Sequence, residues 1–365
     1  MTVSVSEWCN PAIQTLQPYQ PGKPTEELTR ELGLTDVVKL ASNENPRGPG
    51  LAVTSLLARA AGSLSRYPDG SGYRLKQRLA THLNVDVDRL TLGNGSNDVL
   101  ELIARVLLTP GAEAVVSEHA FVVYPLAVIS NGGVLVTVPA RAWGCDLDAM
   151  AQAVNEKTRL VFIANPNNPT GTWVGEAALV DFLERLPEHV VVVLDEAYFE
   201  YVEDPAYPDG VDLQRRFPQL VVTRTFSKIH ALAALRVGYA ISHPELADLM
   251  NRVRQPFNVN ALGLTCAEAA LADLDFVAQS KSLNAAGMNQ LSDGLDRLGV
   301  GFIPSAGNFL CVDVDRDAAP VYQDLLKCGV IVRPIAGYGM PRHLRVTVGL
   351  AEENERFLAA LSEQL

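Results

Sequence analysis

Short apolar runs in the middle of the chain limit the possible folds more than any other feature of the sequence. They are rich in β-branched residues, and they span residues 114–116, 134–138, 160–163, 190–194, 220–222 and 237–241. Strands that are covered on both faces have this pattern, whereas strands with one solvent-exposed face alternate apolar and polar residues. Helical patterns lie between several of the runs, as at residues 175–185. We therefore expect an α/β fold with a mostly parallel sheet flanked by helices.

The composition divides the chain into three parts. A length of 365 residues favours two domains. Residues 1–30 are interrupted by four prolines and are expected to form an N-terminal arm, and residues 31–255 would form a large domain around the sheet. From residue 256 a long helical stretch precedes strand-like runs at 309–314, 330–333 and 344–348. This change predicts a smaller α+β C-terminal domain over residues 256–365.

Charge and cysteine usage exclude several classes of partner. The formal charge of −12 opposes binding to nucleic acid, so an anionic ligand must be met by local positive charge. The first 22 residues lack Lys and Arg, and no run approaches the roughly 20 apolar residues of a membrane span. We therefore expect a cytoplasmic protein with no nucleic-acid or membrane partner. Its five scattered cysteines are typical of reduced thiols, and no metal site is expected.

Residues 91–98, with the sequence TLGNGSND, follow a strand-like stretch and open the clearest helical pattern, which begins at Ser96 and stops before Pro110. Unpaired N–H groups and the helix dipole attract anions at a helix N-terminus, and glycine lets the ligand approach closely. A dinucleotide-binding fingerprint would need glycine in place of Asp98. The segment therefore predicts a phosphate site, although a capped helix start without a ligand would have the same pattern.

Polar segments follow three predicted strands at their carboxyl ends, where open α/β sheets bind ligands. Residues 165–171 form a proline-rich turn that could present an amide, and Asp195 ends the most apolar run. A buried carboxylate is paired, hydrogen-bonded or functional. Lys228 and Arg236 follow the next run, and burial could make Lys228 a nucleophile. Singly these segments also fit a turn, a helix cap and a solvated lysine. Together they suit a phosphorylated aldehyde cofactor with a basic ring nitrogen.

The same segments carry a resemblance to a known family. The chain resembles the fold-type I pyridoxal-phosphate aminotransferases, and within them the histidinol-phosphate aminotransferases, over nearly its whole length. The motifs are LASNENP at 40–46, YPD at 67–69, GNGSN at 93–97, NPNNPTG at 165–171, DEAY at 195–198, SK at 227–228 with Arg236, GVIVR at 329–333 and LRVTVG at 344–349. The resemblance implies a large domain with a mostly parallel sheet and a smaller α+β C-terminal domain.

The resemblance also implies roles for residues around pyridoxal 5'-phosphate. Lys228 would bond covalently to the cofactor's aldehyde carbon and later move the substrate's proton, and Asp195 would pair with the pyridine nitrogen. Asn168 and Tyr198 would bind the ring's O3′, and Phe121 would stack on the ring. The phosphate would be held by Gly95, Ser96, Asn97, Ser227 and Arg236, with Thr225 adding a hydroxyl.

A homodimer with shared sites is implied as well, because Tyr67 in such enzymes reaches the phosphate of the neighbouring subunit's cofactor. For the substrate, the similarity points to Arg333 and Arg345, whose planar guanidinium groups suit phosphate or carboxylate oxygens. Asn43 and Tyr19 would also contact the substrate, although simple packing explains Tyr19 equally well. Phe121 departs from the family, since many relatives have tyrosine there.

The implied reaction exchanges the amino group of L-histidinol phosphate with 2-oxoglutarate, giving imidazole-acetol phosphate and L-glutamate, in histidine biosynthesis. Three alternatives stay open at this point. An aromatic amino acid aminotransferase would have a similar ring pocket. A threonine-phosphate decarboxylase resembles the family closely. A cofactor-binding regulator is disfavoured, because no DNA-binding motif is appended and the net charge opposes DNA.

Overall fold

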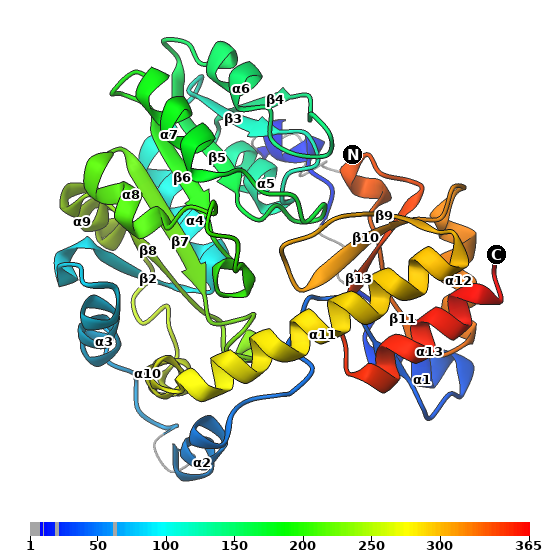
Figure 1. Ribbon diagram of the computed structural model, residues 1–365. Coiled ribbons are helices and arrows are strands. Elements are labelled where there is room, and N and C mark those ends of the chain that lie inside the picture. The colour runs from blue at the N-terminus through cyan, green and yellow to red at the C-terminus, as the bar shows by residue number, and fades with distance from the viewer. Residues whose placement is uncertain (1–7, 10, 19–21, 61–63) are drawn as a thin grey trace, which may run out of the picture.

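A seven-stranded sheet forms the centre of the computed structural model, which describes residues 8–9, 11–18, 22–60 and 64–365 (Figure 1). The strand order is β2-β8-β7-β6-β5-β3-β4. The strands are β2 (Leu90–Asn94), β3 (Glu113–Ser117), β4 (Val134–Val138), β5 (Thr158–Ala164), β6 (Val191–Asp195), β7 (Leu220–Thr225) and β8 (Val237–Ile241). The pairs from β4 to β7 are parallel, and β8 is antiparallel to both of its neighbours. The predicted mostly parallel sheet is confirmed.

Successive residues of the central strands face two different hydrophobic cores. In β3, Val115 packs in one cluster and Ala114 and Val116 pack in the other, as the two-residue period of a strand requires. The prediction of two covered faces is wrong only for β4, whose first and fourth residues are exposed. This strand lies at the sheet edge, where it has one neighbour and less cover.

Helices cover both faces of this sheet (Figure 1). One face packs against α3 (Tyr73–Leu83), α6 (Leu147–Ala153), α7 (Glu176–Arg185), α8 (Gly210–Arg216) and α10 (Ala261–Ala272). The other packs against α4 (Ser96–Leu107), α5 (Val123–Ser130) and α9 (Pro244–Val253). Helix α2 (Leu51–Ala60) contacts α10. Helix α4 begins at Ser96 as predicted, so its N-terminus lies at the carboxyl end of the sheet beside β2.

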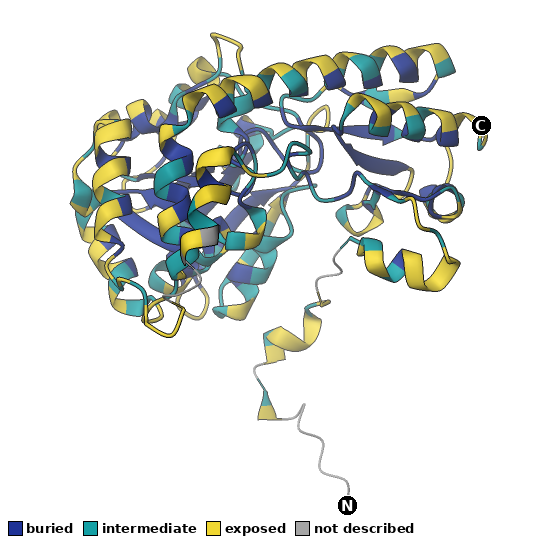
Figure 2. Cartoon of the chain, turned by 90° about the horizontal axis from the view of Figure 1, so that it is seen from below, coloured by how far each residue is buried: buried dark blue, intermediate teal, exposed yellow. Residues whose placement is uncertain are grey.

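A second, four-stranded antiparallel sheet has the order β12-β13-β10-β9. Its strands are β9 (Gly301–Ile303), β10 (Phe309–Asp313), β12 (Arg333–Pro334) and β13 (His343–Thr347), and it is accompanied by α11 (Leu274–Leu298), α12 (Ala318–Lys327) and α13 (Ala351–Ser362). The buried strands and half-exposed helices are visible in Figure 2. The predicted α+β unit at the C-terminal end is confirmed.

Segments from the start of the chain join this second unit. Strand β1 (Val38–Lys39) pairs in parallel with β11 (Val330–Ile331), and α1 (Thr25–Leu32) buries Leu28 against Leu326 and Ile331. Conversely, α10 packs into the core of the large sheet although it follows residue 256. The boundaries at residues 30 and 255 stay predictions, and this packing favours a division inside α11.

Among the described helices, none is both long and apolar enough to cross a membrane.

Candidate active site

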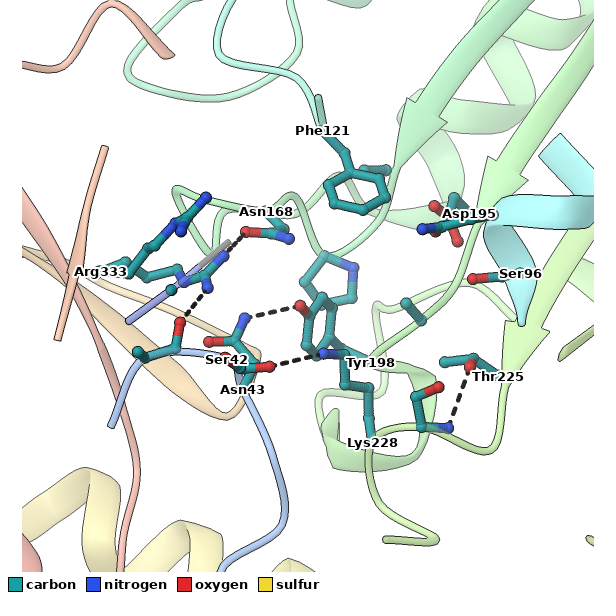
Figure 3. Close-up of a pocket in the computed structure, with 18 of the residues that line it drawn as sticks. Ser42, Asn43, Ser96, Phe121, Asn168, Asp195, Tyr198, Thr225, Lys228 and Arg333 are labelled. Atoms are coloured by element: carbon teal, nitrogen blue, oxygen red, sulfur yellow. Dashed lines mark hydrogen bonds between the residues drawn. The ribbon is translucent and has the colours of Figure 1, made fainter. Parts of the chain in front are cut away.

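A cavity of about 180 Å³ lies between the carboxyl end of the large sheet and the small sheet. Its walls contain most of the predicted site residues, namely Asn43, Ser96, Asn97, Phe121, Asn168, Asp195, Tyr198, Thr225, Ser227, Lys228, Arg236, Arg333 and Arg345. Figure 3 shows Asp195 and Ser96 on one side and Arg333 on the other, with Lys228 and Tyr198 between them. The cavity therefore has two opposite ends with different chemistry.

Lys228 follows β7 and reaches into the middle of the cavity. Its Nζ donates a hydrogen bond to the carbonyl oxygen of Ser42, at 3.1 Å. Burial is the main cause that lowers the pKa of this amine to about 7; the positive charges of Arg345 and Arg236 act in the same direction, and the negative charges of Glu44 and Asp195 oppose them. A large share of the Lys228 side chains is therefore neutral near pH 7, and a neutral amine is the nucleophilic form.

Asp195 is the last residue of β6, and only 4% of its surface is exposed. Burial raises the pKa of its carboxyl group, while two hydrogen bonds and Lys228 oppose that rise. Tyr124 donates to Oδ2 and Thr223 donates to Oδ1, each at 2.9 Å. These bonds fix the plane of the carboxylate and favour its charged form. The group is placed to bind a positively charged N–H.

Tyr198 presents a phenol that keeps its proton. Burial raises its pKa to about 12, and its oxygen accepts a hydrogen bond from Asn43 Nδ2 at 2.8 Å. Asn43 has a left-handed backbone, with φ at 54°, and Thr347 binds both its N–H and its side-chain oxygen. The Tyr198 hydroxyl is thus a donor of fixed position. Asn43 was predicted to bind substrate, and the structure also gives it a positioning role toward Tyr198.

An anion cradle lies where α4 begins. Gly95 precedes the helix with φ at 81°, and a Cβ built there would lie 2.2 Å from Arg236 Nη2, so only glycine lets the guanidinium pack against this turn. Arg236 Nη1 donates to Ser227 Oγ at 3.2 Å. Ser96 and Asn97 line the cavity beside them. Helix N–H groups, a hydroxyl and a guanidinium together suit a phosphate.

Thr225 has a different contact from the one expected. Its hydroxyl donates to the carbonyl oxygen of Val237 at 3.3 Å and accepts from the N–H of Ser227 at 3.1 Å. The side chain therefore holds the turn that carries Ser227. Its predicted hydrogen bond to a phosphate stays a prediction.

At the opposite end of the cavity, Arg333 and Arg345 are directly opposite each other on β12 and β13. Residues paired in this way point to the same face, and like charges there repel. Arg345 donates to the Ala41 carbonyl at 2.7 Å and to Asn168 Oδ1 at 2.5 Å. Although the whole chain carries a charge of −12, this end concentrates positive charge, and an anion would relieve the repulsion.

Among the predicted residues that the structure describes, Tyr67 and Gly95 do not line this cavity. Tyr67 is 83% exposed and stacks on Phe257, with ring centroids 4.7 Å apart, and it does not line the cavity of its own chain. Tyr19 lies outside the described residues. Gly95 packs against the Arg236 guanidinium, which lines the cavity. The other predicted residues are brought together.

Sequence reasoning missed several residues of the site. Tyr124 stands in α5 among apolar residues, so nothing in its pattern marks it as a partner of Asp195. Thr223 could have been found, because it lies opposite Asp195 in the parallel register of β6 and β7. Ser42, in the quoted LASNENP motif, contributes a backbone carbonyl that any residue could supply. Tyr338 lines the cavity from the small unit and also lacked a signal.

Comparison with known proteins identifies the relatives of the chain. Residues 35–361 match the family model described as "Aminotransferase class I and II". The chain is 58% identical to "Histidinol-phosphate aminotransferase 2" of Pseudomonas fluorescens over 357 residues, covering 97% of this chain and 96% of the relative. It is 57% identical to the protein of that name in Pseudomonas aeruginosa, covering 97% of both chains.

Solved structures agree with this comparison. The histidinol-phosphate aminotransferase of Sinorhizobium meliloti, in complex with pyridoxal-5'-phosphate, has a TM-score of 0.89 and 32% sequence identity, covering 97% of this chain and 96% of that one. An aspartate aminotransferase of Thermus thermophilus has a TM-score of 0.84 at 21% identity, covering 98% and 99% of the two chains. The second likeness concerns the fold alone.

Proposed function

The chain belongs to the aminotransferase class I and II family, and from this premise we propose that it transfers the amino group of L-histidinol phosphate to 2-oxoglutarate. The products would be imidazole-acetol phosphate and L-glutamate, in a reversible reaction of histidine biosynthesis. A cytoplasmic location is the natural one for this role. The observation that carries the substrate assignment is the pair of arginines, facing one another across β12 and β13 at the end of the cavity remote from the anion cradle.

The residues fit pyridoxal 5'-phosphate as the cofactor. The buried Asp195 carboxylate, the anion cradle at Gly95 and the neutral Lys228 amine match its ring nitrogen, phosphate and aldehyde. When bound, the cofactor supplies an aldehyde that takes up the substrate's amino group and a ring that accepts electron density. Asp195 would hold a proton on the ring nitrogen, Asn168 and Tyr198 would bind the ring oxygen, and Phe121 would pack on the ring face.

Lys228 would act at the substrate carbon that bears the amino group. Its Nζ has a pKa of about 7, which suits a group that both takes and returns a proton at neutral pH. On the Asp195 side, β7 and the last four residues of β6 are buried, which keeps bulk water away from this end of the cavity. Orientation by Arg333 and Arg345 would bring the reacting C–H bond to Lys228.

Two arginines are more than an α-carboxylate alone requires at this position. Arg345 is the residue with which many relatives bind an amino acid's carboxylate, so it could serve glutamate in one half-reaction and a phosphate in the other. Arg333 adds a second guanidinium, which a dianionic phosphate can use. This arrangement favours a phosphorylated substrate over an aromatic amino acid.

We also propose a homodimer that shares its sites. Tyr67 and Phe257 form an exposed stacked pair, and they line the same surface hollow as Leu64, which is 62% exposed. An exposed aromatic cluster of this kind is typical of a contact surface. In the dimer, Tyr67 would reach the phosphate cradle of the partner subunit.

Mixing two inactive variants tests the shared site. Lys228→Ala and Tyr67→Ala chains, unfolded and refolded together, should regain activity, because one of the two sites in a mixed dimer carries both native residues. Each variant refolded alone is the control. Activity that stays at the level of the separate variants, together with sedimentation as a monomer, would refute the shared site.

A half-reaction tests the substrate assignment. Purified yellow enzyme is mixed separately with histidinol phosphate, phenylalanine and threonine phosphate, and the loss of the yellow absorbance is followed. Rapid loss with histidinol phosphate and slow loss with phenylalanine is the expected result. The reverse order would indicate an aromatic aminotransferase, and release of carbon dioxide from threonine phosphate would indicate a decarboxylase.

A further inference from the structure

Three aromatic side chains line the cavity in the described part of the chain: Phe121, Tyr198 and Tyr338. The first two are tied to the cofactor end. Phe121 packs edge-on against Tyr124, the residue that binds Asp195, with centroids 5.8 Å apart. Tyr198 is held by Asn43. Tyr338 differs from both, because it reaches the cavity from the small unit, on the segment that carries the two arginines.

The position of Tyr338 follows from the connection between β12 and β13. It ends the short 3-10 helix η7 (Ala336–Tyr338), which begins three residues after Arg333. Gly339 follows with φ at 75°, a conformation that turns the chain back toward β13 and Arg345. Tyr338 therefore belongs to the same short connection as both arginines, and it lies close enough to Tyr198 to influence its ionisation.

A contact from the large unit holds this connection in place. His119, in the loop after β3, donates from Nδ1 to the carbonyl oxygen of Tyr338 at 2.5 Å. Its side chain is only 8% exposed. Trp143 packs on it with ring centroids 5.5 Å apart and also contacts His343 of β13 at 5.0 Å. The backbone of His119 is itself fixed, because its carbonyl accepts from Asn167 Nδ2 at 3.2 Å.

The substrate has three groups to place in this cavity. Its phosphate suits Arg333 and Arg345, and its amino carbon must lie at Lys228. The imidazole ring then needs a wall of its own, and an aromatic ring is a favourable neighbour for it because ring faces and edges attract. Phe121 and Tyr198 lie at the cofactor end, whereas Tyr338 is the aromatic residue that lines the substrate side within the described part of the chain. Packing against Ile335 and Met340 holds its side chain in this place.

We propose that Tyr338 is a specificity-determining residue whose ring contacts the imidazole of the substrate, and that His119 is the positioning residue that holds it there. This inference rests on the proposed function, since it assumes histidinol phosphate as substrate. It adds a recognition element for the part of the substrate that the arginines do not bind.

The test compares two substrates that differ only in the ring. The phosphate ester of 2-aminopropan-1-ol has a methyl group where histidinol phosphate has its imidazolylmethyl group. In Tyr338→Leu, kcat/KM for histidinol phosphate should fall about 5- to 150-fold, the range for loss of an aromatic stacking partner. The value for the ring-free substrate and the rate of the glutamate half-reaction should change less than about threefold. Tyr338→Phe should stay close to wild type, because it keeps the ring.

The role of His119 is tested with the same two substrates, through the ratio of their kcat/KM values. His119→Ala should lower the preference for histidinol phosphate over the ring-free substrate in the same direction as Tyr338→Leu. His119→Asn should restore part of it, because asparagine can donate a hydrogen bond and tolerates the φ of 57° at this position. Tyr322→Leu is the matched control, since Tyr322 is a half-buried tyrosine of α12 that lines a different pocket.

The possible failures are distinguishable. If wild type does not convert histidinol phosphate at all, the proposed function is wrong. If wild type converts it but Tyr338→Leu slows both substrates and the glutamate half-reaction equally, or changes none of them, the proposed contact is wrong. An equal loss in Tyr338→Phe and Tyr338→Leu would also refute a contact made through the ring.

Discussion

The two ends of the cavity are built in different ways. At the cofactor end, Asp195 terminates a central strand of the seven-stranded sheet, and both of its carboxylate oxygens accept hydrogen bonds from buried neighbours. At the substrate end, Arg333 lies on a two-residue edge strand, and Arg345 of β13 donates hydrogen bonds to Asn168 of the large unit and to the Ala41 carbonyl. The first end is held by a strand of the large sheet and its buried neighbours, whereas the second depends on the small sheet together with contacts between the two units.

The residues that carry out the proton transfer and the residues that bind the substrate therefore lie at different ends of the cavity. The groups that act on the reacting carbon come from the carboxyl end of the large sheet, where buried hydrogen bonds hold them in the orientation that proton transfer requires. The groups that select the substrate belong to a smaller unit with its own core. Changes at the first end should therefore lower kcat, and changes at the second should mainly raise KM.

The largest effect is expected at Lys228, where the two ends meet. Lys228→Ala removes both the nucleophile and the base, and turnover should be abolished, since general base catalysis alone contributes roughly 10²- to 10⁴-fold. Steady-state assay with histidinol phosphate measures it. Lys327→Ala, an exposed lysine of α12, is the control. Wild-type rates in the Lys228 variant would overturn the whole assignment.

The next largest effect is expected at the cofactor end, where the Asp195 carboxylate is held by hydrogen bonds. Asp195→Asn should lower kcat by about 10²- to 10³-fold, comparable to the removal of one preorganised electrostatic group from an active site. Tyr124→Phe removes one hydrogen bond to that carboxylate and should cost about tenfold, with KM little changed. If Tyr124→Phe proved as damaging as Asp195→Asn, or acted on KM alone, the view of Tyr124 as a support would be wrong.

Arg345→Ala tests the substrate end. We expect substrate binding to weaken by roughly 1.5 to 3 kcal/mol, about 10- to 150-fold in KM, which is the scale of a hydrogen bond to a charged group. Arg342→Ala serves as the control, because this arginine is exposed and pairs with Asp313 and Asp315. An unchanged KM for both co-substrates would exclude Arg345 from the site.

The smallest effect concerns the pKa of Lys228, which burial and the positive charge of Arg345 at the substrate end lower. The pKa of Lys228 is lowered to about 7, so in the cofactor-free protein the neutral amine dominates above that pH and the protonated amine below it. The rate of pyridoxal phosphate uptake should therefore rise with pH and level off above a midpoint near 7. Arg345→Gln removes a positive charge that lowers this pKa and should move the midpoint upward. Stopped-flow absorbance measures both.

The same titration affects stability. Because the Lys228 pKa is lower in the folded than in the unfolded chain, the unfolded chain binds more protons between pH 7 and the ordinary lysine value. The free energy of unfolding contributed by this group therefore rises with pH across that window, and the full penalty is present below pH 7. Lys228→Met should be relatively more stable at low pH, and an identical pH dependence in both proteins would contradict the shift.

The sequence predicted the cofactor end better than the contacts between the two units at the substrate end, for a physical reason. Buried strands have a continuous apolar pattern, so polar residues that end or follow them, such as Asp195 and Lys228, could be recognised as neighbours at one sheet edge. The pairing of β1 with β11 has no such signal, because each strand has two residues. Tyr338 and His119 meet only through the packing of the two units, and local sequence does not encode that packing.

The pairing of β1 with β11 also has a consequence for biosynthesis of the chain. Val38 and Leu40 leave the ribosome long before their backbone partners Gly329, Ile331 and Thr347 have been synthesised. The large sheet is complete in sequence by residue 241, so it can form while translation continues. The wall that contains Ser42 and Asn43 can close only after the last strand has emerged. A chain that stops before β13 therefore holds the reactive lysine in an unfinished pocket, and a complete site requires synthesis through Thr347.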